Sequence, residues 1–87
     1  MMDSAKAQIR QVLRDHARLA VPVDALADGA DLHEAGMTSQ ASVGVMLALE
    51  EAFDVEFPDR MLRRRTFESV DAIHAALREI AGAGAGV

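Results

Sequence analysis

Ser39 is the residue in this chain whose type and position best fit covalent chemistry. It follows Gly36, Met37 and Thr38 at the end of an acidic loop, and it opens an apolar stretch that reads as a helix to about Phe53. A phosphoryl group at such a helix start is favoured by unpaired N–H donors and by the helix dipole. Ser39 could therefore hold a phosphodiester. Alternatively, its hydroxyl or that of Thr38 could simply cap the helix.

The other reactive side chains predict no catalytic set. His16, His33 and His74 stand at no ligand spacing with one another, and the chain contains no cysteine, so a metal site is not expected. Ser39 lacks the flanking glycines of a nucleophile elbow, and no obvious general base accompanies it. The sequence therefore predicts a protein that is not an enzyme.

A cluster of arginines departs from the acidic character of the chain. Its members are Arg60, Arg63, Arg64 and Arg65. Residues 59–65 read as a short helix capped by Asp59, which turns Met61 and Leu62 inward and the arginines outward. Guanidinium groups bind phosphates and carboxylates, so the cluster is either a partner-binding site or a solvated turn. We favour a partner.

Apolar residues at helical spacing predict three longer helices. The first covers residues 3–20, with Asp3 or Ser4 as its cap, and the second is the helix that Ser39 opens. The third begins at Ser69. The positions expected to face the core are Ala5, Ile9, Val12, Leu13, Ala17 and Ala20, then Val45, Met46, Leu49 and Phe53, and finally Val70, Ile73, Ala76, Leu77 and Ile80.

A long loop, residues 21–37, joins the first two helices. Pro22 forces the preceding residue out of the helical region, and loops of this length in a small domain are often functional. Val23, Leu26 and Leu32 are expected to pin the loop to the core.

Charged residues on the first two helices allow more than one interpretation. Four cations recur at four-residue spacing on the first helix and form a docking stripe or, as we favour, a solvated face: Lys6, Arg10, Arg14 and Arg18. Glu50 and Glu51 lie where the helix dipole does not favour them, so they either serve a partner or are solvated. Residues 54–58 then form a connector, with Val55 and Phe57 as core anchors.

Gln40, Val43 and Leu47 form a second line with Ser39 on its helix. Exposed apolar residues beside a reactive one suggest a partner surface, although the loop could also bury them. Both readings stay open.

Composition limits the fold and the partners. Of 87 residues, 51% are hydrophobic but only three are aromatic, which favours helices over strands. One domain over residues 1–81 is expected, followed by a flexible glycine and alanine tail over residues 82–87. The net charge of −5 argues against nucleic acid. No membrane span or signal peptide is evident, so we expect a soluble, cytoplasmic monomer.

From Asp31 to Phe57 the chain resembles an acyl carrier protein. The family pattern of Asp-Leu, Gly, Ser and a helix ending Ala-Leu-Glu-Glu-x-Phe is met, at the family's spacing, by Asp31, Leu32, Gly36, Ser39, Ala48, Leu49, Glu50, Glu51 and Phe53. The family's connector is matched by Val55, Phe57 and Pro58. The resemblance implies an all-α four-helix bundle with three main helices, one short helix and a long first loop. It also implies that Ser39 carries 4′-phosphopantetheine, whose thiol replaces the cysteine that the chain lacks.

Departures from the family pattern narrow the resemblance. Thr38 and Gln40 flank Ser39 where Asp and Leu are usual, and Ala41 and Gly44 stand where acidic residues are common. Partner enzymes that use cationic groups to bind an acidic helix of the carrier should therefore bind this protein poorly. The stretch from Thr38 to Met61 most resembles small stand-alone aminoacyl carrier proteins.

That resemblance implies a non-catalytic carrier of an aminoacyl thioester, glycyl or alanyl. The arm would be attached by a phosphopantetheinyl transferase and loaded by an amino acid:[carrier protein] ligase, a truncated relative of seryl-tRNA synthetases, for a downstream acceptor that the sequence does not name. The residues expected at the partner surface are Thr38, Gln40, Val43, Leu47, Arg63, Arg64 and Arg65. The alternatives are a polyketide or fatty-acyl carrier, and a helical interaction module without a prosthetic group.

Overall fold

The computed structural model describes residues 4–85, and the side chains of residues 5–81. Its three α-helices are α1 (Ser4–His16), α2 (Ser39–Phe53) and α3 (Val70–Ala85). Three short 3-10 turns complete it, namely η1 (Val23–Ala25), η2 (Asp59–Met61) and η3 (Arg64–Phe67). No strand occurs among the described residues. The predicted all-α fold is confirmed, and η2 and η3 take the place of the expected short helix.

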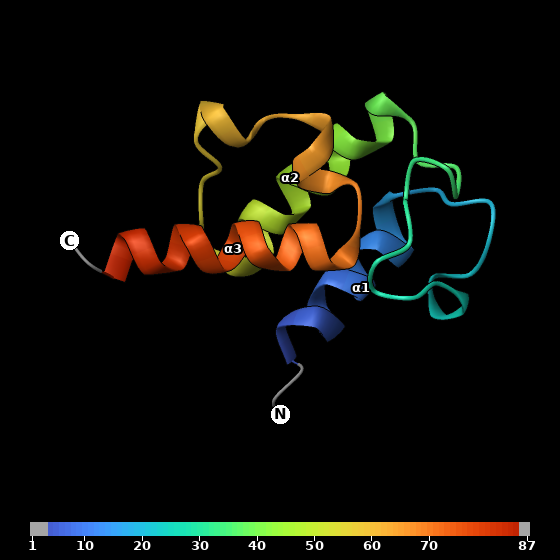
Figure 1. Ribbon diagram of the computed structural model, residues 1–87, viewed down its shortest axis with the longest axis horizontal. Helices are drawn as coiled ribbons and strands as arrows, with labels where there is room; N and C mark the ends of the chain where they lie inside the picture. The colour runs from blue at the N-terminus through green and yellow to red at the C-terminus, as the bar shows by residue number, and fades with distance from the viewer. Residues whose placement is uncertain (1–3, 86–87) are drawn as a thin grey trace.

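The helices cross around one core, and the two long connections lie outside them. In Figure 1, α3 crosses in front of α2, the loop between α1 and α2 lies at the right, and the segment from η2 to η3 runs along the top. The N-terminal end of α2, where Ser39 lies, therefore points toward the corner between the loop and η3.

The core contains most of the apolar positions that helical spacing predicted, but not Ala5 or Ala20. Ile9, Leu13, Leu49 and Ile73 are fully buried, one or more from each helix. The loop is pinned as expected, because Val23 and Leu32 are buried and Leu26 packs against the core. Val55 and Phe57 anchor the connector in the same way, and the Phe57 ring meets that of Phe67 edge to face at 5.2 Å.

The first helix ends earlier than predicted. It stops at His16 instead of residue 20, because Arg18 adopts a left-handed conformation with φ of 56°. Ala20 consequently lies outside the helix and is exposed, and its N–H donates to the Ala35 carbonyl at 2.8 Å. Asp3, one of the two expected caps, lies outside the described residues.

Cations on one side of α1 hold the loop against the helix. The solvated-face prediction is confirmed for Arg14 and Arg18, which are exposed, and is wrong for Lys6 and Arg10, which are partly buried. Arg10 donates to the carbonyls of Val23 and Leu26 at 2.8 and 2.9 Å and pairs with Asp28. Lys6 also pairs with Asp28, at 3.1 Å. Further pairs join Lys6 to Asp71 on α3 and Arg14 to Asp24 in η1. These contacts fix the loop that leads to Ser39.

Glu50 also has a role that neither reading of its charge anticipated. Its Oε2 accepts a hydrogen bond from the N–H of Phe57 at 2.9 Å, and its carbonyl accepts the N–H groups of Asp54 and Val55. Asp54 turns the chain in a left-handed conformation with φ of 54°. Glu50 therefore ends α2 and holds the connector, whereas Glu51 is exposed.

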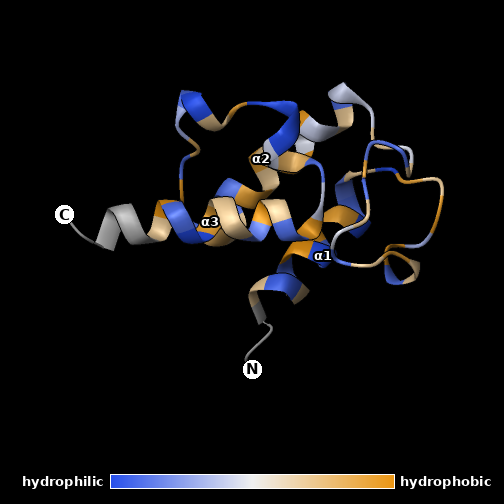
Figure 2. Cartoon of the chain, in the orientation of Figure 1, coloured by the Kyte–Doolittle hydropathy of each residue, from blue (hydrophilic) through white to orange (hydrophobic). Residues whose placement is uncertain are grey.

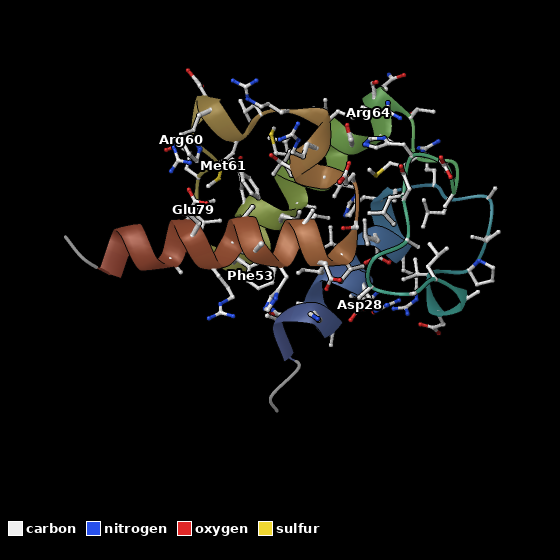
Figure 3. The ribbon with its side chains drawn as sticks, in the orientation of Figure 1. Asp28, Phe53, Arg60, Met61, Arg64 and Glu79 are labelled. Carbon is white, nitrogen blue, oxygen red and sulfur yellow. The ribbon has the colours of Figure 1, made fainter. Side chains whose placement is uncertain are left out.

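The arginine segment is not the helix that was predicted. The N-cap position of η2 is held by Pro58, and no side chain, including that of Asp59, caps the turn. Leu62 closes η2 in a non-helical conformation, so its side chain is 47% exposed, whereas Met61 is buried as expected. The expectation that Leu62 points inward is wrong. Figure 3 shows Arg60 beside Glu79 of α3, with which it pairs at 2.6 Å.

The third helix begins as predicted. Ser69 is buried, and its hydroxyl accepts a hydrogen bond from the N–H of Ala72 at 3.0 Å. The helix continues to Ala85, past the boundary expected at residue 81, and residues 86–87 lie outside the described part. Among residues 4–85, no helix is both long and apolar enough to cross a membrane.

Candidate functional site

Thr38, and not Ser39, caps α2. Its hydroxyl accepts a hydrogen bond from the N–H of Ala41 at 3.0 Å, while its own backbone is extended. The Ser39 side chain is exposed, and within residues 5–81 its hydroxyl takes part in no hydrogen bond. The carbonyl of Ser39 accepts the Ser42 hydroxyl at 2.7 Å. The structure thus leaves the Ser39 oxygen available at the positive end of a helix of 15 residues.

A tight turn presents Ser39. Gly36 has φ of 118°, a conformation that L side chains rarely adopt, and a Cβ there would lie 2.9 Å from the backbone nitrogen of Ala20. The side chain of Met37 is buried, and its N–H donates to the carbonyl of Leu32 at 3.0 Å. Gly36 packs against the backbone of Ala20, and Met37 is held by its buried side chain and by its hydrogen bond to Leu32.

His33 joins this turn to η3. Its Nδ1 lies 3.3 Å from the carbonyl oxygen of Met37, and its Nε2 lies 3.4 Å from the carbonyl oxygen of Arg64. The half-buried ring thereby reaches from its own turn to Arg64, which lies 31 residues further along the chain. Sequence reasoning found no role for His33. The contact with Met37 has helical spacing, but no local pattern encodes the contact with Arg64.

A groove of about 350 Å³ opens beside Ser39, between α2 and the segment from η2 to η3. Its lining combines apolar residues, hydroxyls and cationic groups, with no carboxylate: His33, Ser39, Ser42, Val43, Met46, Leu62, Arg63, Arg64 and Phe67. In Figure 2 the segment from η2 to η3 is mostly hydrophilic, with a hydrophobic stretch between its two turns, and it runs near hydrophobic parts of α2. The groove is positively charged in a chain of net charge −5.

The predicted partner residues lie on more than one side of α2. Val43, Arg63 and Arg64 line the groove with Ser39. Thr38 and Gln40 line a separate polar hollow against the end of α1. On the outer face, Val43 and Leu47 are 53% and 56% exposed, so the loop does not bury them. Arg65 is exposed on η3 and does not line the groove.

These residues suit a phosphodiester-linked group. The exposed hydroxyl of Ser39 lies at a helix N-terminus, where a phosphate is favoured, and Arg63 and Arg64 line the same groove, whose lining contains no carboxylate. A family model described as a phosphopantetheine attachment site matches residues 7–77, most of the chain. The chain belongs to this family of carrier proteins.

Individual relatives agree with this assignment. The carrier is 50% identical to an aminoacyl carrier protein of Agrobacterium fabrum over 74 residues, 85% of this chain and 89% of the relative. A crystal structure of the Agrobacterium tumefaciens carrier protein, in complex with an engineered Bradyrhizobium japonicum glycine:[carrier protein] ligase and ATP, matches with a TM-score of 0.85 at 49% identity, over 87% of this chain and 99% of that one.

A further match is the glycylated carrier protein in complex with the Bradyrhizobium japonicum ligase. Its TM-score is 0.73 at 27% identity, over 85% of this chain and 99% of that one. The family assignment confirms a non-catalytic carrier, and its prosthetic group is 4′-phosphopantetheine.

Proposed function

We propose that this carrier protein holds an aminoacyl group, glycyl or alanyl, on 4′-phosphopantetheine attached to Ser39. One observation carries the proposal: the hydroxyl of Thr38 caps α2, which leaves the hydroxyl of Ser39 exposed. When bound, the arm supplies the thiol that forms the thioester, which suits a chain without cysteine. The chain itself supplies the attachment oxygen and a rigid mount for it.

The partners follow from the proposed cargo. A phosphopantetheinyl transferase attaches the arm, and an amino acid:[carrier protein] ligase resembling a truncated seryl-tRNA synthetase loads it. The relatives that bind glycine:[carrier protein] ligase support this choice. Within the chain, the exposed Val43 and Leu47 offer apolar contact area on α2, and Arg63 to Arg65 offer cations on the adjoining segment. We place Thr38 and Gln40 at the edge of the same interface.

Intact mass tests the attachment. Wild type co-expressed with a phosphopantetheinyl transferase should gain one phosphopantetheine, whereas Ser39→Ala should gain none. Ser42→Ala is the matched control, because Ser42 lines the same groove but lies three residues further into α2 than Ser39. Unmodified wild type would support an interaction module without a prosthetic group, and modified Ser39→Ala would move the attachment to another residue.

Loading tests the cargo. Holo protein should accept glycine or alanine from an amino acid:[carrier protein] ligase in the presence of ATP, detected as an added aminoacyl mass that hydroxylamine releases. A malonyl or acyl transferase is the competing donor, and loading by that enzyme alone would support a polyketide or fatty-acyl carrier. Attachment of the arm uses coenzyme A as its source, and loading of the amino acid uses ATP. Because both compounds are cytoplasmic, we propose a cytoplasmic location.

A further inference from the structure

The arginines of this chain differ in whether a carboxylate neutralises them. Among the described residues, Arg10, Arg14 and Arg60 each pair with an Asp or Glu. Arg63 donates through Nε to the carbonyl of Arg60 at 3.0 Å. The guanidinium of Arg64 takes part in no hydrogen bond or ion pair within residues 5–81, and Arg64 is one of the residues that line the groove beside Ser39.

His33 lies between the backbone of Arg64 and the turn that presents Ser39. His33 contacts the carbonyl of Arg64 with one ring nitrogen and the carbonyl of Met37 with the other. Met37 lies two residues before Ser39. Figure 3 shows Arg64 at the end of η3 that passes the beginning of α2. One imidazole thus links the segment that carries the cation to the segment that carries the hydroxyl.

We propose that Arg64, positioned by His33, binds the phosphodiester of the prosthetic arm and holds the first part of the arm on the η3 side of α2. This inference rests on the proposed attachment at Ser39. A phosphodiester carries one negative charge and two free oxygens, which match the paired donors of a guanidinium. The hollow on the opposite side of α2 is a poorer site because its one arginine, Arg18, shares the lining with the carboxylate of Asp15, whereas the groove has two arginines and no carboxylate.

The interaction is weak enough for the arm to leave when a partner engages it. Exposed ion pairs of this kind shift a population by about 1.4- to fivefold. High salt should remove the effect, because the screening length falls from about 10 Å at 0.1 M to about 3 Å at 1 M. The arm would therefore lie more often on the η3 side of α2 but would still be free to leave it.

Phosphorus NMR on the holo protein, with no partner enzyme present, tests the proposal. Arg64→Gln should move the ³¹P resonance of the phosphodiester and remove its dependence on NaCl. Arg64→Lys should give an intermediate position, since it keeps the charge but not the paired donors. Arg65→Gln is the matched control, because Arg65 is an exposed arginine of the same turn that does not line the groove. It should superpose on wild type.

Two further readouts separate binding from a general structural effect. His33→Ala should move the ³¹P resonance toward the Arg64→Gln position and add nothing in the Arg64→Gln background, as expected for residues that act together. Nuclear Overhauser contacts between the arm and the methyl groups of Val43 or Leu62, which line the groove, should weaken in Arg64→Gln.

The outcomes also distinguish this proposal from the proposed function. Coincident ³¹P resonances in holo wild type, Arg64→Gln and Arg65→Gln at low salt would overturn it while leaving the attachment at Ser39 intact. A change in ligase kinetics with unchanged ³¹P resonances would likewise overturn it, because Arg64 would then act on the ligase and not on the arm. Failure of wild type to acquire the arm would instead reject the proposed function itself.

Discussion

The hydroxyl of Thr38 accepts a hydrogen bond from the N–H of Ala41 at 3.0 Å, so α2 does not need the hydroxyl of Ser39 as its cap. Thr38→Ala should therefore lower the free energy of unfolding by about 1 kcal/mol, the usual cost of losing an N-cap. Ser39→Ala should leave it within about 0.5 kcal/mol of wild type, as for other exposed positions. Urea denaturation followed by circular dichroism measures both. A larger loss for Ser39→Ala than for Thr38→Ala would mean that Ser39 is the structural residue.

The ion pairs around Asp28 should make stability depend on pH at the acid end. Hydrogen bonds from Arg10 and then Lys6 hold the pKa of the Asp28 carboxyl below its ordinary value of 3.8. Because the folded pKa lies below the unfolded one, this stabilisation is present above about pH 4 and is lost as the pH falls through the folded value. Asp28→Asn should thus be less stable than wild type at pH 7, and the difference should shrink toward pH 3.

The basic end gives the opposite sign for Lys6. Hydrogen bonds to Asp28 and then Asp71 raise its pKa above 10.5. Its stabilisation is therefore present below that pH and is lost as the pH rises through the folded value.

Denaturation midpoints for wild type and Asp28→Asn between pH 3 and pH 7 check the acid limb. A difference that does not change with pH would show that Asp28 acts through packing and not through charge.

Local patterns predicted much of this fold because the helices obey local rules. Spacing located the core residues, and Thr38 and Ser69 cap α2 and α3 as hydroxyl residues at helix starts do. The early end of α1 was missed because Arg18 adopts a left-handed conformation that glycine usually signals. Leu62 was misplaced because the same arginine-rich sequence suits a helix or two tighter turns, and the structure has the two turns, the second of which packs against α2 and α3.

The functional corner was only partly predictable for a related reason. The motif around Ser39 lies within one stretch of sequence, so its resemblance to a carrier protein was visible. The contacts of Arg10 with the loop, of Glu50 with Phe57 and of His33 with Arg64 join residues that are distant in sequence. Such pairs depend on how the segments pack, and no spacing rule reveals them.

The exposed residues proposed for the ligase interface should matter for loading and not for folding. Replacing Val43 and Leu47 together by Ser should change stability by no more than about 1 kcal/mol, because both are more than half exposed. Loading of the holo protein should fall in kcat/KM. Val21→Ser is the matched control, since Val21 is also exposed but lies in the loop. Equal loading by all three proteins would remove α2 from the interface.

Alanine in place of each of the three arginines, Arg63 to Arg65, should likewise spare stability, since exposed charges contribute little. The coupling to the ligase should weaken when the variant carries the arm. The measurement is kcat/KM for aminoacylation of the triple variant against wild type, with Arg78→Ala, an exposed arginine on α3, as the control. Unchanged loading kinetics in the triple variant would exclude the arginines from ligase recognition.

Two glycines on either side of Ser39 should respond oppositely to the same substitution. At Gly36, a new Cβ would meet the backbone nitrogen of Ala20 at 2.9 Å, and φ is 118°. We expect Gly36→Ala to lower the free energy of unfolding by about 1 to 3 kcal/mol, and to slow modification of Ser39 because the turn must shift.

At Gly44, within α2, no atom lies within 4 Å of a new Cβ. Gly44→Ala should raise stability by about 0.5 to 1 kcal/mol, because alanine loses less backbone freedom in a helix. Thermal and urea unfolding of both variants, with intact mass after timed modification, check the pair. A stable Gly36→Ala protein that is modified at the wild-type rate would show that this turn does not position Ser39.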